Sequence, residues 1–515
     1  MKGAKTMKGK KALLSVYDKT GIVELASELV SMGWELLSSS GTADRLRQAG
    51  LQVTEVSELT GYPSILGGRV KTLHPLVFGG ILARRDVPGD MKESEEYKIP
   101  LLDMIVCNLY PFEETAKKSP RLDDLIENID IGGVSLLRAA AKNYRHAIPL
   151  VDPKDYGEVT AELKSHGDVS LPARERLALK AFSQTASYDG AIVDGLRAAW
   201  GGAFPLLPEK LPLGLTKKQE LRYGENPHQQ AALYLPPLAE TPWEQLSGKP
   251  LSYNNLLDAD CAMRGCALLA GSCGSVVIKH ATPSGMACGK TQAEAYEKAV
   301  ACDPVSAFGG VTGLSKKLDM ETALSISKLF TEAVVAPEID GDAASFLREN
   351  RPSLRLLRWN GGRASPLQFT GTWSGILVQE DCLPPLPVQE DGEWVGRPRP
   401  DLWEDLMLAW KAAALSKSNA ISIVRDLEAV GIGRGFCSRL HAVEFAAAQA
   451  GERARGAVLG SDAFFPFPDG VEAAARAGVA AIIQPGGSQK DSQVFEAAER
   501  LGISMFISGS RTFRH

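Results

Sequence analysis

Short apolar segments alternate with amphipathic ones from residue 11 to about residue 150, and this alternation limits the fold more than any other feature. The apolar segments have the length and composition of strands and the others the pattern of helices; the former are residues 12–16, 34–38, 104–108 and 147–151, and the latter include residues 21–32 and 43–49. Such alternation predicts an α/β protein with a parallel sheet and helices on its faces. Ligands of such sheets bind beyond the carboxyl ends of the strands.

Three of the expected strand ends carry residue types that bind phosphate. Residues 15–21 and 38–42 each lead from a strand into a helix, where hydroxyl groups, glycines and backbone N–H groups can face an anion. In residues 67–75, Arg69 and Lys71 flank a valine, so extended backbone would place both side chains on one face. Each serine-rich turn alone could be a helix cap, and the basic segment a solvated loop. Three such ends in one sheet favour an anion site.

Two further segments of the first 150 residues place polar groups at the ends of expected elements. Asn108 ends an expected strand, with Tyr110 just beyond it, and Asp130 precedes two glycines and a helix that it could simply cap. If this helix starts near Gly133, Lys142 lies ~13 Å farther along its axis, at 1.5 Å per residue. Asp130 and Lys142 would therefore meet at one atom only if the helix bends.

Residues 151 to about 215 are expected to be mostly helical, with residues 177–185 the clearest segment. Residues 201–215 are rich in Gly, Pro and Leu and poorly periodic, which is typical of a linker. The expected domains are residues 1–200 and 216–515. Within the second, residues 221–229 are too rich in Arg, Asn, His and Gln for a core segment, and their Asn-Pro pair disfavours a helix.

The second half has its own centre at residues 276–285, where an apolar run ends in Lys279-His280 and Pro-Ser-Gly follows. A strand that ends in a turn would deliver both groups to one rim of a sheet. Histidine titrates near neutrality, and lysine can stabilise developing negative charge. Residues 480–488 repeat the order of apolar strand, proline turn and glycine before a helix, which suggests two related α/β lobes in residues 216–515.

Composition excludes several classes of protein. The formal charge of −5 is small for 515 residues, so no nucleic-acid footprint is indicated. No apolar run approaches the ~18–20 residues that span a bilayer, so no membrane association is expected. None of the eight cysteines forms a Cys-x-x-Cys pair, which favours reduced thiols in the cytoplasm over a zinc or disulfide framework.

Seven segments occur in the order of a known family; they are residues 15–21, 68–75, 130–143, 222–229, Lys279-His280, residues 461–467 and the Arg-x-Phe-x-His end. Over nearly its whole length the chain resembles the bifunctional purine-biosynthesis proteins that join AICAR transformylase to IMP cyclohydrolase. The resemblance implies an N-terminal methylglyoxal-synthase-like cyclohydrolase domain and a transformylase of two cytidine-deaminase-like lobes. It also implies a homodimer with transformylase sites at the interface, and the substrates AICAR, formyl-AICAR and 10-formyltetrahydrofolate. It implies no catalytic metal and allows a structural monovalent cation.

The resemblance assigns roles to particular residues. In the cyclohydrolase it makes Lys71, Tyr110, Asp130 and Lys142 catalytic, and the nucleotide is held by Ser15, Lys19, Ser39, Thr42, Arg69, Thr72 and Asn108. In the transformylase it makes His280 the base for the AICAR amine and Lys279 the group that stabilises the oxyanion or protonates the departing folate nitrogen. The remaining substrate contacts are Arg222, Tyr223, Asn255, Asn419, Arg439, Phe464 and Arg511. From the residues alone, the pair Phe464-Phe465 could be plain core or could wall a flat heterocycle.

The chain departs from the family pattern at a few positions. Ser40 stands where a glycine is usual and would add a Cβ near the phosphate. Residues 433–439 (Gly-Arg-Gly-Phe-Cys-Ser-Arg) replace the usual Gly-Ala-Gly-Gln-x-Ser-Arg, and Thr282 replaces a common Asn. Two competing hypotheses are a zinc deaminase, which would need His-x-Glu and Cys-x-x-Cys, and a nucleotide sensor that keeps the sites without turnover. A sensor would not need Lys71, Asp130, Lys279 and His280.

Overall fold

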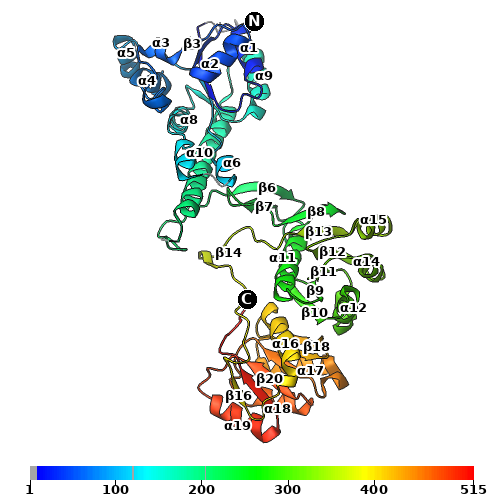
Figure 1. Ribbon diagram of the computed structural model, residues 1–515. Coiled ribbons are helices and arrows are strands. Elements are labelled where there is room, and N and C mark those ends of the chain that lie inside the picture. Colours follow the sequence, from blue (N-terminus) through cyan, green and yellow to red (C-terminus); the bar gives the residue numbers. More distant parts are fainter. Residues whose placement is uncertain (1–8, 119–120, 203) are drawn as a thin grey trace. The chain divides into compact units, whose positions relative to one another are not determined.

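The computed structural model describes residues 9–118, 121–202 and 204–515, which separate into two compact units (Figure 1). Unit 1 comprises residues 1–216 and 235–239, and unit 2 comprises residues 217–234 and 240–515. In the described part of the chain, no helix is both long and apolar enough to cross a membrane.

Unit 1 is built on a sheet of five parallel strands in the order β3-β2-β1-β4-β5. The strands are β1 Lys11–Val16, β2 Glu35–Ser38, β3 Thr54–Glu55, β4 Met104–Asn108 and β5 Ile148–Leu150. The helices are α1 Ile22–Ser31, α2 Ser40–Gln48, α3 Val56–Thr60, α4 Pro75–Leu82, α5 Pro88–Glu96, α6 Phe112–Lys117, α7 Leu122–Glu127, α8 Gly132–Lys142, α9 Tyr156–His166 and α10 Leu171–Trp200. The predicted α/β class and parallel sheet are confirmed.

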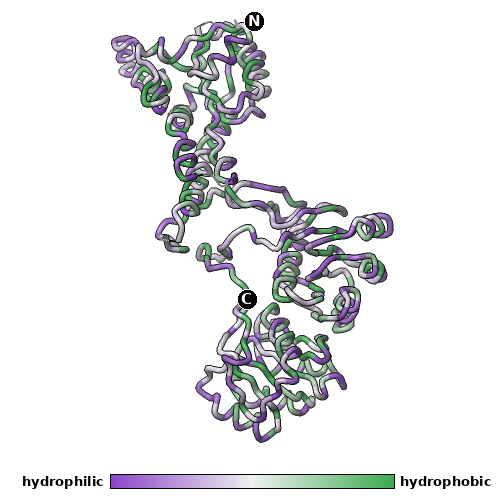
Figure 2. Tube along the Cα trace, viewed as in Figure 1, coloured by the Kyte–Doolittle hydropathy of each residue, from purple (hydrophilic) through white to green (hydrophobic). Residues whose placement is uncertain are grey.

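Side-chain alternation along β1 explains why helices cover both faces of this sheet. Leu14 packs with residues of α1 and α9, whereas its neighbour Leu13 packs with residues of α4 and α8. Successive residues of a strand point to opposite faces, so a strand with consecutive buried apolar residues, such as Ala12-Leu13-Leu14 of β1, needs cover on both faces. Figure 2 shows hydrophobic segments recurring along the chain between hydrophilic ones.

The expected strands and helices of unit 1 are present, with ends that differ by no more than one residue except at α2. That helix starts at Ser40, three residues before its apolar pattern begins. Residues 177–185 lie inside the long helix α10. The described residues of the segment 201–215 form no helix or strand. This segment ends against α10. A Cβ added to Gly190 of that helix would lie only 3.1 Å from the Cα of Gly214.

Unit 2 contains a twelve-stranded sheet in the order β16-β21-β20-β19-β17-β18-β10-β9-β11-β12-β13-β8. Its strands are β8 Trp243–Ser247, β9 Gly274–Lys279, β10 Thr282–Cys288, β11 Gly310–Leu314, β12 Thr331–Ala336, β13 Arg355–Trp359, β16 Glu393–Val395, β17 Ile421–Arg425, β18 Glu428–Gly433, β19 Val458–Ser461, β20 Ala481–Gln484 and β21 Ser504–Ile507. Its helices are α11 Tyr253–Leu268, α12 Gln292–Cys302, α13 Pro304–Ala307, α14 Met320–Ser327, α15 Gly341–Asn350, α16 Trp403–Leu415, α17 Arg439–Ala450, α18 Asp469–Arg476 and α19 Asp491–Leu501.

The large sheet consists of two lobes with the same order of elements. Lobe A runs α11-β9-β10-α12-β11-α14-β12-α15-β13, with the short α13 added, and lobe B runs α16-β17-β18-α17-β19-α18-β20-α19-β21. Read outward from the β10–β18 junction, the strand order is the same in both lobes, with β8 and β16 at the two edges. The chain therefore does contain two related α/β lobes.

The sequence echo from which these lobes were predicted is wrong. Pro283-Ser284-Gly285 lies within strand β10, which forms an antiparallel hairpin with β9, and the next helix begins only at Gln292. After β20 the chain instead goes directly to helix α19. The structural counterpart of the β9–β10 hairpin is the β17–β18 hairpin, and the two share little sequence.

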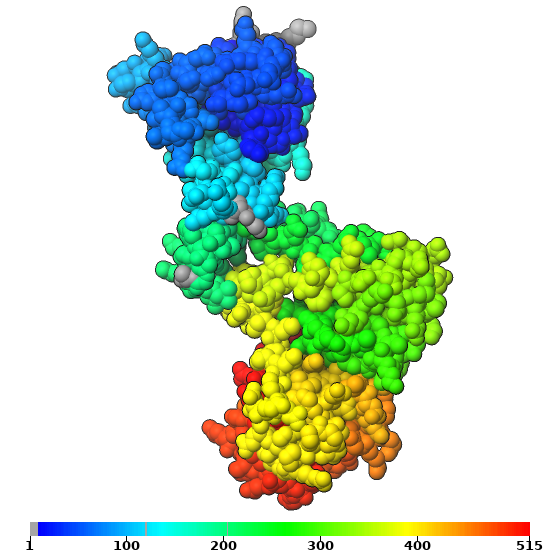
Figure 3. Space-filling view, in the orientation of Figure 1, coloured from blue at the N-terminus to red at the C-terminus, as the bar shows by residue number. Residues whose placement is uncertain are grey.

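Two small hairpins lie outside the large sheet. One joins β6 Thr216–Leu221 to β7 Ala231–Leu235, and the other joins β14 Leu367–Thr372 to β15 Gly375–Glu380. The second hairpin is exposed along nearly all of its length, and Trp373 near its tip is fully exposed. Figure 3 shows the part of the chain around this hairpin, coloured yellow-green to yellow, on the visible surface of unit 2.

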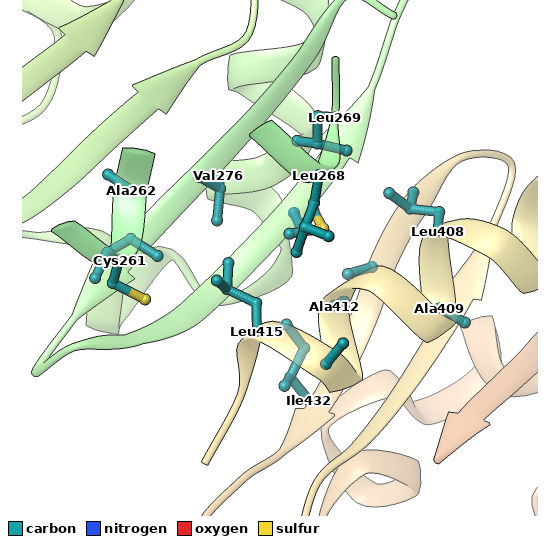
Figure 4. Packing of buried hydrophobic residues seen from close by; sticks show 14 of the residues in the cluster. Cys261, Ala262, Leu268, Leu269, Val276, Leu408, Ala409, Ala412, Leu415 and Ile432 are labelled. Carbon is teal, nitrogen blue, oxygen red and sulfur yellow. The ribbon is translucent and has the colours of Figure 1, made fainter. Parts of the chain in front are cut away.

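One hydrophobic core joins the lobes of unit 2. Figure 4 shows Cys261 and Leu268 of α11 beside Val276 of β9, with Ala412 and Leu415 of α16 on the other side. These residues are buried and belong to a single cluster that also contains Trp410, which is 0% exposed. The equivalent helices α11 and α16 thus pack at the centre of the unit.

Candidate active sites

A cavity of about 530 Å³ opens in unit 1 at the carboxyl ends of β1, β2 and β4. Among its lining residues are ten of the eleven that the sequence assigns to this domain; they are Ser15, Lys19, Ser39, Thr42, Arg69, Lys71, Thr72, Asn108, Tyr110 and Asp130. The N-termini of α2 and α8 also line it, through residues 40–42 and 131–133. Free backbone N–H groups at two helix ends make this cavity suited to an anion.

Hydroxyl groups and one lysine gather at the α2 end of the cavity. The hydroxyl of Ser39 occupies the N-cap position without capping the helix and lies 3.0 Å from the Ser15 hydroxyl. Lys19 Nζ donates to Thr42 Oγ1 at 3.1 Å and to the carbonyl oxygen of Val16. Burial lowers the pKa of Lys19, although the Asp18 charge opposes this shift. A partly desolvated ammonium and a pair of hydroxyls that, among the described residues, are bonded only to each other are groups that could bind a phosphate here.

At the α8 end lies a carboxyl group with a perturbed pKa. Asp130 Oδ1 accepts the Gly133 N–H at 2.7 Å, so Asp130 does cap α8 while it lines the cavity. Burial raises the pKa of Asp130, and the N–H groups of Gly133 and Tyr110 and the Lys71 charge partly offset the rise. Burial and the Asp130 charge also raise the pKa of Tyr110. Asp130 could therefore cap the helix and also transfer protons, two roles that the sequence left as alternatives.

The segment that carries Arg69 and Lys71 begins with a tight turn of positive-φ residues, so the expectation of an extended backbone is wrong. Leu66, Gly67 and Gly68 have φ values of 54°, 65° and 95°, and Ile65 pairs with Val70. A Cβ on Gly68 would lie 2.8 Å from Lys71 Cε, so this glycine leaves room for the lysine. Arg69 reaches the cavity rim and pairs with Glu127.

One predicted residue of unit 1 lies away from the cavity, and another lines it with its side chain already hydrogen-bonded. Lys142 is exposed at the last residue of α8 and is not among the lining residues, because α8 remains straight enough to carry it away from Asp130. Asn108 lines the cavity, but its amide is occupied: Oδ1 accepts the N–H groups of Tyr17 and Asp18, at 2.6 and 2.9 Å, and Nδ2 donates to the Asp18 carbonyl. Asn108 therefore shapes the turn after β1.

Several predicted residues of unit 2 lie near one edge of the large sheet. Strands β10 and β18 are antiparallel, so the Lys279–His280 turn that precedes β10 lies on the same side as the end of β18. Ile421 of β17 pairs with Gly433 and with Ser461, which places the start of β17 and the end of β19 at this edge. The parallel strands β19, β20 and β21 end there too. Asn419, Arg439, Phe464 and the tail that carries Arg511 directly precede or follow these strand ends.

Lys279 and His280 have distinct surroundings. Lys279 Nζ donates to the carbonyl oxygens of Phe308 and Gly309, each at 3.0 Å, and His280 is exposed in the turn. His280 and Ala281 have φ values of 57° and 56°, a conformation that non-glycine residues rarely adopt. The N–H of Ala281 donates to Asp258 Oδ1 at 2.6 Å. An ammonium group has three donors, so Lys279 is held by two and can offer the third to a ligand.

Arg439 belongs to a buried hydrogen-bond network. It is 6% exposed and donates to Asp462 Oδ1 at 2.5 Å, to Ser461 Oγ at 2.8 Å and to Asn419 Oδ1 at 2.7 Å. Asn419 Nδ2 in turn donates to the Phe436 carbonyl at 2.8 Å. Both residues were predicted to touch substrate, but their polar atoms hold the loops of this edge together.

Among the other predicted contacts of unit 2, some side chains are used within the fold and others are exposed. Asn255 forms a capping box with Ser252 at the start of α11, which uses its side chain locally. Phe465 is core at 1% exposure, whereas Phe464 is only half-buried. Arg222, which lies over the Tyr223 ring, and Arg511 are exposed and free to meet a ligand.

The positions that depart from the family pattern each have a local account. Ser40 lines the cavity with φ at 30°, a conformation in which glycine would be less strained. Phe436 packs on Phe445, and Cys437 is exposed. The Thr282 hydroxyl is buried with no hydrogen-bond partner among the described residues.

Sequence reasoning missed three residues that support these sites: Asp258, Gly309 and Asp462. Gly309, with φ at 68°, leaves space for Lys279, because a Cβ there would lie 3.2 Å from Nζ. Asp462 stands within the segment 461–467 noted in the sequence, but no local pattern shows which distant backbone or side-chain group an aspartate such as Asp462 or Asp258 will meet. In the described ranges no group of three or more His, Cys, Asp or Glu could hold a metal ion.

Comparison with known proteins matches both units. The family model "AICARFT/IMPCHase bienzyme" matches residues 140–449, and the model "MGS-like domain" matches residues 21–135, which include most of the cavity lining. The chain belongs to the AICARFT/IMPCHase bienzyme family. The predicted family and the methylglyoxal-synthase-like N-terminal fold are thereby confirmed.

Curated relatives of this bienzyme chain resemble it from end to end. A "Bifunctional purine biosynthesis protein PurH" of Persephonella marina is 45% identical over 520 residues, covering 98% of this chain and 100% of the relative. Proteins of the same name from Cyanothece sp. and Bacillus mycoides are 45% and 44% identical, each covering 98% of this chain and 99% and 100% of the relative.

Proposed function

We propose that this chain catalyses two consecutive reactions of purine biosynthesis. The first transfers a formyl group from 10-formyltetrahydrofolate to the 5-amine of AICAR, which gives formyl-AICAR and tetrahydrofolate. The second closes formyl-AICAR to IMP with loss of water. The observation that carries this function is membership of the bienzyme family, with a relative that is 45% identical and covers 98% of the chain.

Cyclisation belongs to the unit 1 cavity in this account. Ser15, Ser39, Lys19 and the start of α2 bind the phosphate of formyl-AICAR. The carboxamide nitrogen attacks the formyl carbon, and an oxyanion forms that the Lys71 ammonium stabilises. Asp130, whose pKa is raised, moves protons as water leaves.

Formyl transfer belongs to the edge of unit 2 that carries Lys279 and His280. The AICAR amine is a weak nucleophile because its lone pair is delocalised into the imidazole and the carboxamide. His280 removes the amine proton during attack on the formyl group. The free N–H of Lys279 stabilises the tetrahedral oxyanion or protonates the leaving folate nitrogen. Arg222 and Arg511, which are exposed cations, supply the phosphate contacts.

Several finer features rest on the family resemblance. We propose division of the two activities near residues 201–215, a homodimer with transformylase sites at its interface, a cytoplasmic location and a structural monovalent cation. The exposed β14–β15 hairpin supports the homodimer, because large apolar side chains such as Trp373 are commonly covered in assemblies.

Product analysis tests the function and separates it from a nucleotide sensor. Purified protein given AICAR and 10-formyltetrahydrofolate should yield IMP and tetrahydrofolate, followed by absorbance and by chromatography of the nucleotides. Formyl-AICAR without IMP would indicate an inactive unit 1 site. Ser40 would then be the first residue to replace with the glycine that is usual in the family. Nucleotide binding with no product at all would support the sensor.

A further inference from the structure

The turn that carries His280 is strained and is held by one aspartate. Lys279 pairs with Thr282 across the β9–β10 hairpin, so His280 and Ala281 form a two-residue turn. Both have positive φ, the conformation in which two-residue hairpin turns favour Asn-Gly or Gly-Gly. Neither residue is glycine, so the turn needs support from its surroundings. The support visible here is the hydrogen bond from the Ala281 N–H to Asp258 Oδ1, at 2.6 Å.

Lobe B contains the same device without the catalytic pair. Its equivalent turn, Asp426-Leu427, has φ values of 52° and 58°. Asp405 on α16, the helix equivalent to α11, accepts the N–H groups of both turn residues, at 3.1 and 2.7 Å. In both lobes, an aspartate on a helix thus accepts hydrogen bonds from a hairpin turn with positive φ. Only the turn of lobe A carries the Lys-His pair.

The Asp258 carboxylate is close to the chemistry as well as to the backbone. Burial raises its pKa, while the His280 and Lys279 charges act in the opposite direction and the Glu332 charge adds to the rise. Asp258 is half-buried on α11, and Lys279 is itself fixed by two carbonyl oxygens. His280 is exposed, and its backbone is set by the turn.

We propose that Asp258 is a positioning residue for formyl transfer, which acts by holding the His280–Ala281 turn so that the imidazole meets the AICAR amine. The inference rests on the proposed role of His280. A hydrogen-bond acceptor at this place is the essential feature, and the negative charge is secondary. Small displacements of a catalytic group lower kcat strongly, because reacting atoms must be held in a narrow geometry.

Two conservative variants of the full chain separate position from charge. Asp258→Asn keeps an oxygen at the same distance and loses the charge, so kcat for formyl transfer should fall less than about threefold. Asp258→Glu keeps the charge but moves the oxygen by a methylene, so kcat should fall about tenfold or more with KM for AICAR nearly unchanged. Asp258→Ala should lose as much as Asp258→Glu or more. The reverse order of Asn and Glu would overturn the proposal.

Asp405→Ala is the matched control, because it removes the same brace from lobe B. Its melting temperature should fall about as much as that of Asp258→Ala, while its kcat for formyl transfer stays within about twofold of wild type. Equal losses of kcat in both variants would show a merely structural role and refute the inference. Cyclisation of supplied formyl-AICAR should be unchanged in all variants. If His280→Ala retains formyl transfer, the proposed function of this turn fails, independently of Asp258.

Discussion

The Lys279 ammonium lies 3.0 Å from the carbonyl oxygen of Gly309, and a Cβ added to that glycine would be only 3.2 Å from Nζ. Gly309→Ala should therefore displace the ammonium and lower kcat for formyl transfer about tenfold, since an oxyanion donor must be placed closely to act. Gly451→Ala is the control, because Gly451 also has positive φ but no atom within 4 Å of an added Cβ. Both variants carry backbone strain, and loss of formyl transfer in both alike would contradict the prediction.

Ser40 is expected to weaken nucleotide binding in unit 1. Its φ of 30° and its place in the cavity lining predict that Ser40→Gly lowers KM for formyl-AICAR about threefold, by relieving strain and removing the Cβ. Ser39→Gly should act in the opposite direction, because it removes the hydroxyl beside Ser15. Steady-state cyclisation kinetics measure both effects, and a higher KM in Ser40→Gly would be inconsistent with an anion bound at this turn.

Arg439 is expected to matter for stability more than for substrate contact. Its pair with Asp462 is buried, and removing one partner leaves an uncompensated charge, which typically costs about 3–5 kcal/mol. Denaturant unfolding of Arg439→Ala should show a loss of this size in unit 2, with cyclisation in unit 1 retained. If Arg439→Ala has wild-type stability but cannot bind AICAR, the result would contradict this prediction and support a direct contact between Arg439 and the substrate.

The raised pKa of Asp130 predicts the pH dependence of cyclisation. As a base, Asp130 must be ionised, so the acid limb of kcat/KM should lie above the usual carboxyl range of about 4. The same shift has a definite sign for stability: the folded state favours protonated Asp130, so this contribution is present at low pH and is lost as pH rises through the folded-state pKa. Asp130→Asn should remove both the activity limb and this pH-dependent contribution; an acid limb near pH 4 or below would contradict the assignment.

Much of unit 1 could be predicted from sequence because its information is local. Each of the four apolar runs of five residues corresponds to a strand, and the residues predicted to bind phosphate follow strand ends that a parallel sheet brings together. What failed depended on backbone detail: the coil at residues 66–68 turned Arg69 and Lys71 away from extended geometry, and a straight α8 carried Lys142 away from the cavity.

Unit 2 was harder because its contacts join distant segments. The equivalence of the β9–β10 and β17–β18 hairpins is visible only in the strand order, since the two turns, His280-Ala281 and Asp426-Leu427, share no residue. Likewise, nothing local to Arg439 or Asn255 shows that their polar atoms are used within the fold. Residue type identified these positions, but whether a group is free depends on partners from elsewhere in the chain.

We propose that one chain holds two separable active sites, and a pair of variants tests this most directly. His280→Ala should abolish formyl transfer and cyclise supplied formyl-AICAR at the wild-type rate. Lys71→Ala should form formyl-AICAR at the wild-type rate and fail to close it, and a mixture of the two should restore IMP from AICAR. If His280→Ala, folded by its melting curve, also lost cyclisation, the assignment of the two reactions to two sites would be wrong.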